Sequence, residues 1–450
     1  MSLEATRTNA DSLRDQRLKS ASGFFWLSAF YFVYCTRPED WIRPLGLVPI
    51  AKLTAVGAIL TFVLGSRQGR RRFHEVPVEA HYLLGLIGGL LLSSVLSPVW
   101  RGGAVSHTLD FSKVYIAWTL TFLLMTNMAK LRRIVFIQAF SVPIICTIAV
   151  IKGHSIPRLD GVIGGIYSNP NDFAFAIVLS YPFCFMFLLT TRGVRKLFWL
   201  FGMFSMAAAL VLTASRGGFV TLMATGIVGL WHFGVRGKRH SLIVVTGVVT
   251  VLLLTVAGGP LKKRFEAIWI DNPETRQEAR ASSSFEDRKY LMERALEGWA
   301  HYPLLGMGTR NFEIYSLDWH EVHMTYLEVA VEGGIVGLTL YLLFFARGFR
   351  NLHILLKRKD LTRDVQMMTW ALHSSLIGFV VGALFAPEAY QYFPFFTVAY
   401  TSALFAIVRD QDAANLAAGE SPGSPVRKLT SWTLPATTIP QTAPLSPSAK

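Results

Sequence analysis

Cysteine, charged residues and nucleotide-binding motifs are all scarce in this sequence. Its 450 residues include three cysteines, Cys35, Cys146 and Cys184, which lie in or beside apolar runs without CxxC spacing. This spacing excludes a disulfide framework and a cysteine-based zinc site. The sequence also has no G-x-x-x-x-G-K-[ST] motif, which excludes a nucleotide-driven pump of that type. No cleavable signal peptide is expected, because the chain opens with polar residues.

Charged residues make up only 16% of the chain, against 52% hydrophobic residues and a mean hydropathy of +0.39. Soluble domains carry about 25% charged residues, so this composition predicts an all-α polytopic membrane protein in contact with membrane lipids. The net charge of +15 comes from short clusters between apolar runs rather than from one basic surface. We therefore expect no nucleic-acid partner.

Twelve apolar runs are candidates for membrane-spanning helices. About 20 helical residues cross a hydrocarbon core of about 30 Å. The predicted spans are residues 22–36, 46–65, 80–98, 110–128, 134–151, 172–190, 197–214, 218–235, 241–258, 324–346, 366–386 and 391–408.

Lys and Arg are distributed unevenly between alternate connections. The N-terminal stretch and the even-numbered connections carry 23 of them, and the short odd-numbered connections carry 6. Because cytoplasmic loops are rich in Lys and Arg, both termini are predicted to be cytoplasmic. The long polar connection then lies outside, where 9 Lys/Arg and 11 Asp/Glu between residues 259 and 321 require contact with water.

These assignments divide the chain into five parts. The predicted parts are a cytoplasmic tail (1–21), spans one to nine (22–258), a large outer loop (259–323), spans ten to twelve (324–408) and a disordered cytoplasmic tail (409–450). The last part is rich in Pro, Ser and Thr, which is typical of disorder.

Two arginines are candidates for binding an anion on the outer side. Arg216 lies in the turn 213–218 between two spans, and the alternative is a charge that snorkels to headgroups. Arg288 lies in an amphipathic helix, for which Ser284 is the expected N-cap with Asp287 near N3. This helix could rest on the membrane surface. The alternative for Arg288 is a solvated ion pair.

His323 is the last polar residue before the tenth predicted span. A neutral imidazole at the water edge of a helix suits general-base chemistry near pH 7. The alternative is an interfacial histidine beside Trp319 and His320. Glu328 and Glu332, one turn apart in the same span, are expected to pack with nearby cations.

Two further polar stretches lie on the predicted outer side. In residues 161–172, Asn169 is expected to cap a helix with Pro170 at N1, while the glycines allow a ligand to approach the backbone. Glu39 and Asp40 could hold a divalent cation, although two adjacent carboxylates form a poor cage.

Together these motifs resemble the bacterial O-antigen ligase and polymerase family over residues 161–337. The motifs are Gly-x-x-x-Asn-Pro-Asn-x-x-Ala (165–174), Ser-Arg-Gly (215–217), an Arg-x₆-Ala-x₃-Trp helix (288–299) before Pro-Leu-Leu-Gly-Met-Gly (303–308), and His-x-x-Tyr-Leu (323–327) before Glu-x-Gly-Ile-Val-Gly (332–337). The Arg-Pro-Glu-Asp-Trp turn (37–41) looks like the O-glycosylation ligases found beside exopolysaccharide and exosortase loci.

The resemblance implies a glycosyltransferase of the bacterial inner membrane with a periplasmic loop. Its donor would be an undecaprenyl-diphosphate-linked glycan, and its acceptor a lipid or glycan hydroxyl. Neither a metal nor a cofactor is implied. Other polysaccharide-assembly proteins are candidate partners.

By motif, the resemblance assigns catalytic roles to His323, Arg288 and Arg216. The predicted substrate-binding residues are Asn169, Asn171, Arg216, Arg288, Trp299 and Tyr326. One departure from the family pattern is Met324, which stands where the family often has Asn.

Three alternatives remain open from the sequence. Ligase and polymerase differ only in their acceptor. A transporter or flippase for a lipid-linked saccharide or another solute would show paired charges near mid-membrane and related halves. A noncatalytic scaffold in polysaccharide assembly is the third.

Overall fold

The computed structural model describes residues 23–65, 69–153, 158–159, 161–244, 276–318 and 320–417, and residues 247, 251 and 255 singly. Every regular element in these ranges is helical, which confirms the predicted all-α class. Residues 23–36 form the first helix. The others are α2 (Pro38–Trp41), η1 (Arg43–Leu47), α3 (Ile50–Leu64), η2 (Phe73–Glu75), α4 (Val78–Val95), α5 (Arg101–Leu124), α6 (Met128–Lys152), η3 (Gly165–Tyr167), α7 (Pro170–Thr190), α8 (Arg195–Thr213), α9 (Arg216–Gly229), η4 (Leu230–Arg236), α12 (Arg276–His301), α13 (Phe312–Tyr315), α14 (Thr325–Lys357), α15 (Arg363–Gly382) and α16 (Tyr392–Ala417).

Eight helices in the described part of the chain are long and apolar enough to cross a membrane. They are α4, α6, α7, α8, α9 continued by η4, α14, α15 and α16. The predicted second span is a shorter apolar helix of 15 residues, α3. The predicted ninth span (241–258) lies largely outside the described residues. The structure therefore shows a multi-pass membrane protein, and the number twelve stays a prediction.

The centre of the bundle is formed by α16 and α7. Their apolar windows are 83% and 78% buried, against 39% for α4 and 33% for α9 with η4. Central helices in a membrane bundle bury their apolar side chains against protein, and peripheral ones expose them to lipid. Large aromatic side chains fill this core, including Tyr31, Tyr167 and Tyr400, each at most 2% exposed.

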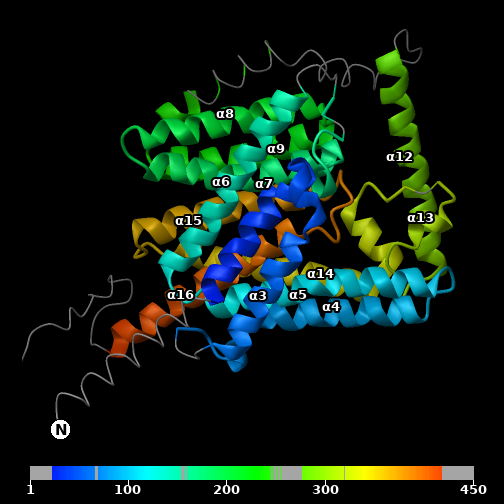
Figure 1. Ribbon diagram of the computed structural model, residues 1–450, viewed down its shortest axis with the longest axis horizontal. Coiled ribbons are helices and arrows are strands. Elements are labelled where there is room, and N and C mark those ends of the chain that lie inside the picture. The colour runs from blue at the N-terminus through cyan, green and yellow to red at the C-terminus, as the bar shows by residue number, and fades with distance from the viewer. Residues whose placement is uncertain are drawn as a thin grey trace, which may run out of the picture.

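The described connections gather at two opposite ends of the bundle. We call one the loop end (37–49, 96–100, 161–169, 214–215, 302–318, 320–324 and 383–391) and the other the tail end (69–77, 125–127, 191–194, 358–362 and the end of α16). Figure 1 shows α12 and α13 at one end, and the orange-red C-terminal part of α16 at the opposite one.

Hydrogen bonds and ion pairs hold each end together. At the loop end, Ser97 Oγ donates to Met307 O (2.6 Å) and Thr325 N to Ala383 O (2.8 Å). At the tail end, Arg71 NH1 donates to Met125 O (2.6 Å), and Arg71 pairs with Asp410 (3.2 Å). This arrangement agrees with the predicted alternation of connections. Which end faces the periplasm stays a prediction.

The helix α12 differs from its prediction in two ways. Ser284 is not its N-cap, because the helix already runs from Arg276; Ala, Arg, Gln and Glu before Ser284 favour continued helix. The apolar side chains of this amphipathic helix, which were expected on one face, also divide into two sets. Leu291 and Ala295 are buried in a second hydrophobic cluster with Phe312, whereas Tyr290 and Leu296 are about half exposed.

A break in α14 attaches the loop to the membrane bundle. Gly334 has φ +64°, outside the helical region, and a Cβ there would lie 2.2 Å from Leu304 O. Across this break, Met307 N donates to Val331 O (3.0 Å) and Ile335 N to Pro303 O (2.8 Å). The carbonyl groups freed by the break thus bind the returning loop, which fixes it relative to the helix that begins just after His323.

Candidate functional site

Arg216 is the first residue of α9 and follows a turn of two residues. Ala214 adopts a left-handed conformation (φ 49°), and Ser215 caps α9 by accepting a hydrogen bond from Gly218 N (3.1 Å). This cap fixes the direction of the helix start. The guanidinium is therefore carried on rigid backbone at the loop end, half-buried rather than on a free loop.

The two glycines after Arg216 allow close packing on both sides of the turn. A Cβ at Gly217 would lie 2.8 Å from the Cβ of Phe385, and a Cβ at Gly218 would lie 2.6 Å from the Cβ of Ala174. Any larger residue would push the helix start away from its neighbours. The Arg-Gly-Gly sequence therefore sets Arg216 between α7 and the α15–α16 connection.

Asn169 and Asn171 organise the start of α7 beside Arg216. Asn169 is the N-cap and accepts from Asn171 N (2.9 Å), as predicted. The Asn171 side chain accepts from Ser215 Oγ (2.8 Å), and Arg158 Nε donates to Thr213 O (3.0 Å). The predicted substrate-binding residue Asn171 thus contacts the Arg216 turn directly, and its amide oxygen is already engaged in this structure.

His323 and Arg288 lie close enough to interact electrostatically. Burial, the positive charge of Arg288 and that of His320, in decreasing order, together lower the pKa of His323 to about 4. The His323 Nδ1 atom is buried without a hydrogen-bond partner in the described part of the chain. At pH 7 the imidazole is neutral, which is the state that can accept a proton.

The segment 383–388 connects the two halves of the candidate site. Thr325, two residues after His323, donates from its Oγ1 to Ala386 O (2.7 Å). Phe385, in the same segment, packs against Gly217 beside Arg216. The structure therefore brings Arg216, Arg288 and His323 to the same end of the bundle, with His323 next to Arg288 and the segment 383–388 between them and Arg216.

A buried acidic cluster beneath this segment was not predicted as a unit. Glu328, Glu332 and Glu388 are each 2% exposed. Tyr390 donates to Glu332 Oε2 (2.6 Å), and Arg310 pairs with Glu313 (2.8 Å) and with Glu321. The predicted packing of Glu328 and Glu332 with a cation agrees with this arrangement.

Arg310 interacts electrostatically with two members of the acidic cluster, Glu328 and Glu332. Burial lowers the pKa of Arg310, but Glu328, Glu332 and Glu313 together raise it above its usual range. Burial also raises the pKa of Glu388, with further contributions from Asp172 and Glu328. Sequence reasoning missed Glu388 because it lies 60 residues after Glu328 in the chain, and no local pattern links the two. The available signal was that Glu328 and Glu332 in an apolar span need a partner.

The remaining predicted substrate-binding residues already have contacts within the protein. The Tyr326 hydroxyl donates to Val380 O (3.0 Å). Trp299 is half-buried against the second hydrophobic cluster, and its Nε1 atom has no hydrogen-bond partner among the described residues. Tyr326 and Trp299 both lie at the loop end, and their substrate-binding role stays a prediction.

Glu39 and Asp40 are close to a cation of their own chain. Arg37 Nε donates to Asp40 Oδ2 (2.6 Å) and lies 3.8 Å from Glu39. Within the described ranges, no group of three His, Cys, Asp or Glu side chains is arranged to hold a metal ion.

The fold and the site define a multi-pass helical membrane protein with basic and imidazole side chains collected at one end. Residues 201–342 match the family model described as O-antigen ligase, so this chain carries an O-antigen ligase family domain. This confirms the resemblance that its motifs indicated. The matched segment runs from α8 into α14 and contains Arg216, Arg288 and His323. No curated protein matches the chain.

Proposed function

We propose that this protein transfers a glycan from undecaprenyl diphosphate to an acceptor hydroxyl at the periplasmic face of the inner membrane. The family match and the membrane helices support membrane glycosyl transfer in general. The observation that carries the finer proposal is the placement of Arg216, Arg288 and His323 around the segment 383–388.

In this proposal the two arginines bind the diphosphate of the donor. A guanidinium forms bidentate hydrogen bonds to phosphate oxygens and keeps its charge at any physiological pH. Arg216 is held by its helix cap and Arg288 by the packing of α12, so neither must reorganise during the reaction. Fixed charges of this kind stabilise a leaving diphosphate without a metal, an effect worth about 3 kcal/mol for one donor.

His323 accepts the proton of the attacking hydroxyl. The acceptor oxygen forms a bond to the anomeric carbon, the bond from that carbon to the diphosphate breaks, and undecaprenyl diphosphate leaves with the electron pair. Because Arg288 contributes to the low pKa of His323, a diphosphate bound at Arg288 offsets that charge and raises the pKa. Donor binding thereby makes the imidazole a stronger base.

The test is complementation of a deletion strain with variants at equal protein levels. We expect Arg216→Ala, Arg288→Ala and His323→Ala each to lower glycan transfer by about 10²- to 10⁴-fold. His301→Ala is the matched control, because His301 is exposed at the end of α12 and is not among the groups that shift the pKa of His323. Normal transfer by all three variants would contradict the mechanism.

Gel analysis of the surface glycan from the same strains separates the two acceptor classes. Loss of long chains on their lipid acceptor, with lipid-linked polymer accumulating, supports ligation. A product with a single repeat supports polymerisation.

The break in α14 favours one second candidate, a transporter for lipid-linked saccharide. Interrupted helices beside buried charges are typical of transporters, and Glu332 lies two residues before Gly334. Purified protein in liposomes distinguishes the two functions. Movement of lipid-linked sugar across the bilayer without its transfer to an acceptor would support the transporter.

A further inference from the structure

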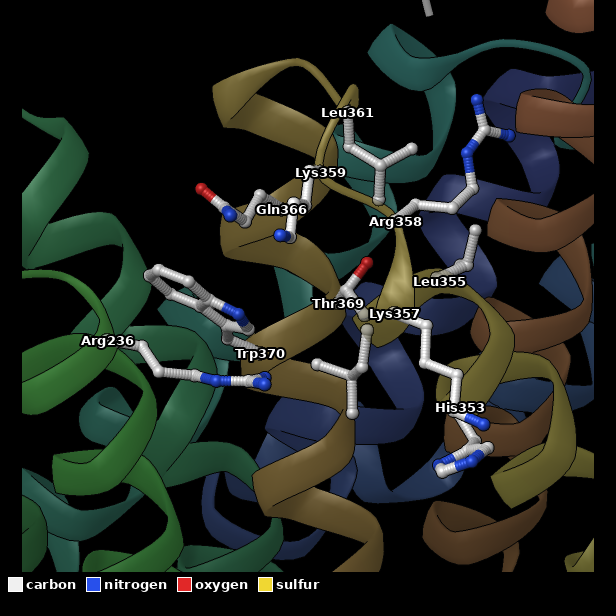
Figure 2. A pocket seen from close by; sticks show the side chains of 11 residues that line it. Arg236, His353, Leu355, Lys357, Arg358, Lys359, Leu361, Gln366, Thr369 and Trp370 are labelled. Carbon is white, nitrogen blue, oxygen red and sulfur yellow. The ribbon is translucent and has the colours of Figure 1, made fainter.

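A pocket of about 560 Å³ lies at the tail end, between η4, the end of α14 and the first turns of α15. Figure 2 shows Arg236 entering from one side, with His353 and Lys357 on the other and Lys359 above them. The volume is within the range of about 300–1,000 Å³ that small-molecule sites occupy. None of the predicted site residues lines it.

The charges in this pocket are unbalanced. Arg236, Lys357 and Lys359 are exposed and form no ion pair with a carboxylate in the part of the chain that the structure describes. Arg358 differs, because its Nε donates to Asp360 (3.0 Å) and its NH2 to Asp412 (3.1 Å). In Figure 2 its side chain points away from the other cations. The pocket thus presents three cations to one volume without an acidic partner.

An unusual helical segment positions Arg236. Residues 230–236 form a π-helix, η4, and such segments occur frequently at functional sites. His232 of η4 stacks on Trp370 of α15 (centroids 6.0 Å apart) and meets His373 with Nε2 and Nδ1 3.1 Å apart. These contacts hold η4 against α15, so Arg236 and Trp370 line the same side of the pocket.

Apolar side chains form the other part of the pocket. Leu355, Leu356 and Leu361 line it together with Trp370. Trp231 of η4 is 56% exposed, and η4 continues a helix apolar enough to span a membrane. A soluble anion uses only the cations of such a site, whereas a ligand with a charged head and apolar chains uses both parts.

We propose that this pocket binds the headgroup of an anionic glycerophospholipid, with the phosphate at Arg236, Lys357 and Lys359 and the acyl chains along the apolar surface. Basic pockets between helices at a membrane boundary suit such headgroups. The site lies at the opposite end of α14 from His323, about 50 Å away for a helix of 33 residues. It is therefore separate from the glycan-transfer site and does not rest on the proposed function.

The experiment measures lipid binding by native mass spectrometry of the full-length protein in detergent. Dioctanoyl phosphatidylglycerol, dioctanoyl phosphatidylcholine and inorganic phosphate are titrated separately. We expect phosphatidylglycerol to bind at least tenfold more tightly than the other two probes. In the triple variant Arg236→Gln, Lys357→Gln, Lys359→Gln its binding should weaken about 100-fold, since each cation near an anionic lipid contributes about fivefold.

The matched control is the triple variant Arg192→Gln, Arg195→Gln, Lys196→Gln. It removes three exposed cations, one just before α8 and two in its first turn, at the same end but outside the pocket. We expect wild-type binding of phosphatidylglycerol in this control. Equal weakening in both triple variants, or none in the pocket variant, would overturn the proposal.

A competition measurement and two single variants complete the test. Inorganic phosphate that competes with phosphatidylglycerol at equal affinity would show a free-phosphate site and overturn the lipid assignment. If the triple variant fails to fold, the single variant Arg236→Gln replaces it, with about fivefold weaker binding expected. Arg236→Lys keeps the charge and should retain most of the affinity.

Discussion

The two ends of the bundle handle charge in different ways. At the tail end the acidic partners in ion pairs are at least partly exposed; for example, Asp410 is 46% exposed where it pairs with Arg71, and Asp364 is 57% exposed where it pairs with Arg132. At the loop end, Glu328 and Glu332 are 2% exposed and interact with the cation Arg310. Exposed pairs add little to stability, whereas buried carboxylates are costly without a partner.

This difference distinguishes ion pairs that join helix ends from charged side chains that are candidates for a functional site. Ion pairs at the tail end hold helix ends together and can be lost individually. Buried charges at the loop end reduce stability, so their retention beside Arg216, Arg288 and His323 is what a reaction site would require. The basic pocket at the tail end is the exception there, because Arg236, Lys357 and Lys359 form no ion pair with a carboxylate among the described residues.

The pH dependence of transfer is expected to show the largest effect. Since the pKa of His323 is lowered to about 4, kcat/KM for the donor should be constant at neutral pH and fall about tenfold per pH unit below 4. The pKa seen in kcat should be higher, because bound diphosphate offsets the charge of Arg288. If the pKa values seen in kcat/KM and in kcat were both near 6.5, His323 would be solvated and independent of Arg288.

The pKa of His323 also predicts how the free energy of unfolding changes with pH. Between its folded-state pKa of about 4 and its ordinary value of 6.5, the folded protein binds fewer protons at His323 than the unfolded chain does. The contribution of His323 to stability therefore rises with pH across this window and is constant above it. Thermal unfolding of wild type and His323→Asn across pH 4–7 measures this difference.

Removing one cation at each end compares the two kinds of charge directly. Arg310→Gln leaves Glu328 and Glu332 without their cation and should lower the free energy of unfolding by about 2–3 kcal/mol, the low end for a buried pair because Arg310 is partly exposed. Arg358→Gln at the tail end should cost about 1 kcal/mol or less. Thermal unfolding in one detergent measures both, and equal losses would remove the distinction.

A smaller effect is expected at Tyr326. Its hydroxyl donates to Val380 O, so Tyr326→Phe should lower the free energy of unfolding by about 1 kcal/mol through the lost hydrogen bond. If the hydroxyl serves only this contact, transfer by the folded variant remains normal. A change in KM for the donor with unchanged stability would instead support the predicted substrate-binding role.

Local patterns were sufficient to predict much of the fold. Apolar runs indicated the helices, and Asn169 with Pro170 indicated the start of α7. The predicted start of α12 was wrong, because a single capping residue competed with a longer run of residues that favour helix. Ser284 is a good N-cap residue, but the helix formers before it extend α12.

The sequence could not show the contacts that join distant segments. The break at Gly334 depends on the loop 303–308, which lies about 30 residues earlier in the chain. Glu388 is another example. Its backbone N donates to Thr325 Oγ1 (2.9 Å), and this long-range contact brings Glu388 beside Glu328. The family motifs named Arg216, Arg288 and His323, and the structure supplied the segment 383–388 between them.

A double-mutant cycle between Arg288 and His323 tests most directly whether these groups act on one donor. The rate of transfer from undecaprenyl-diphosphate-linked glycan is measured for Arg288→Gln, His323→Ala and the double variant in reconstituted membranes. Residues that act as a unit show strongly non-additive losses. We predict that the double variant is within about threefold of the slower single variant. If the two losses instead multiply, Arg288 and His323 act independently and the proposed site is wrong.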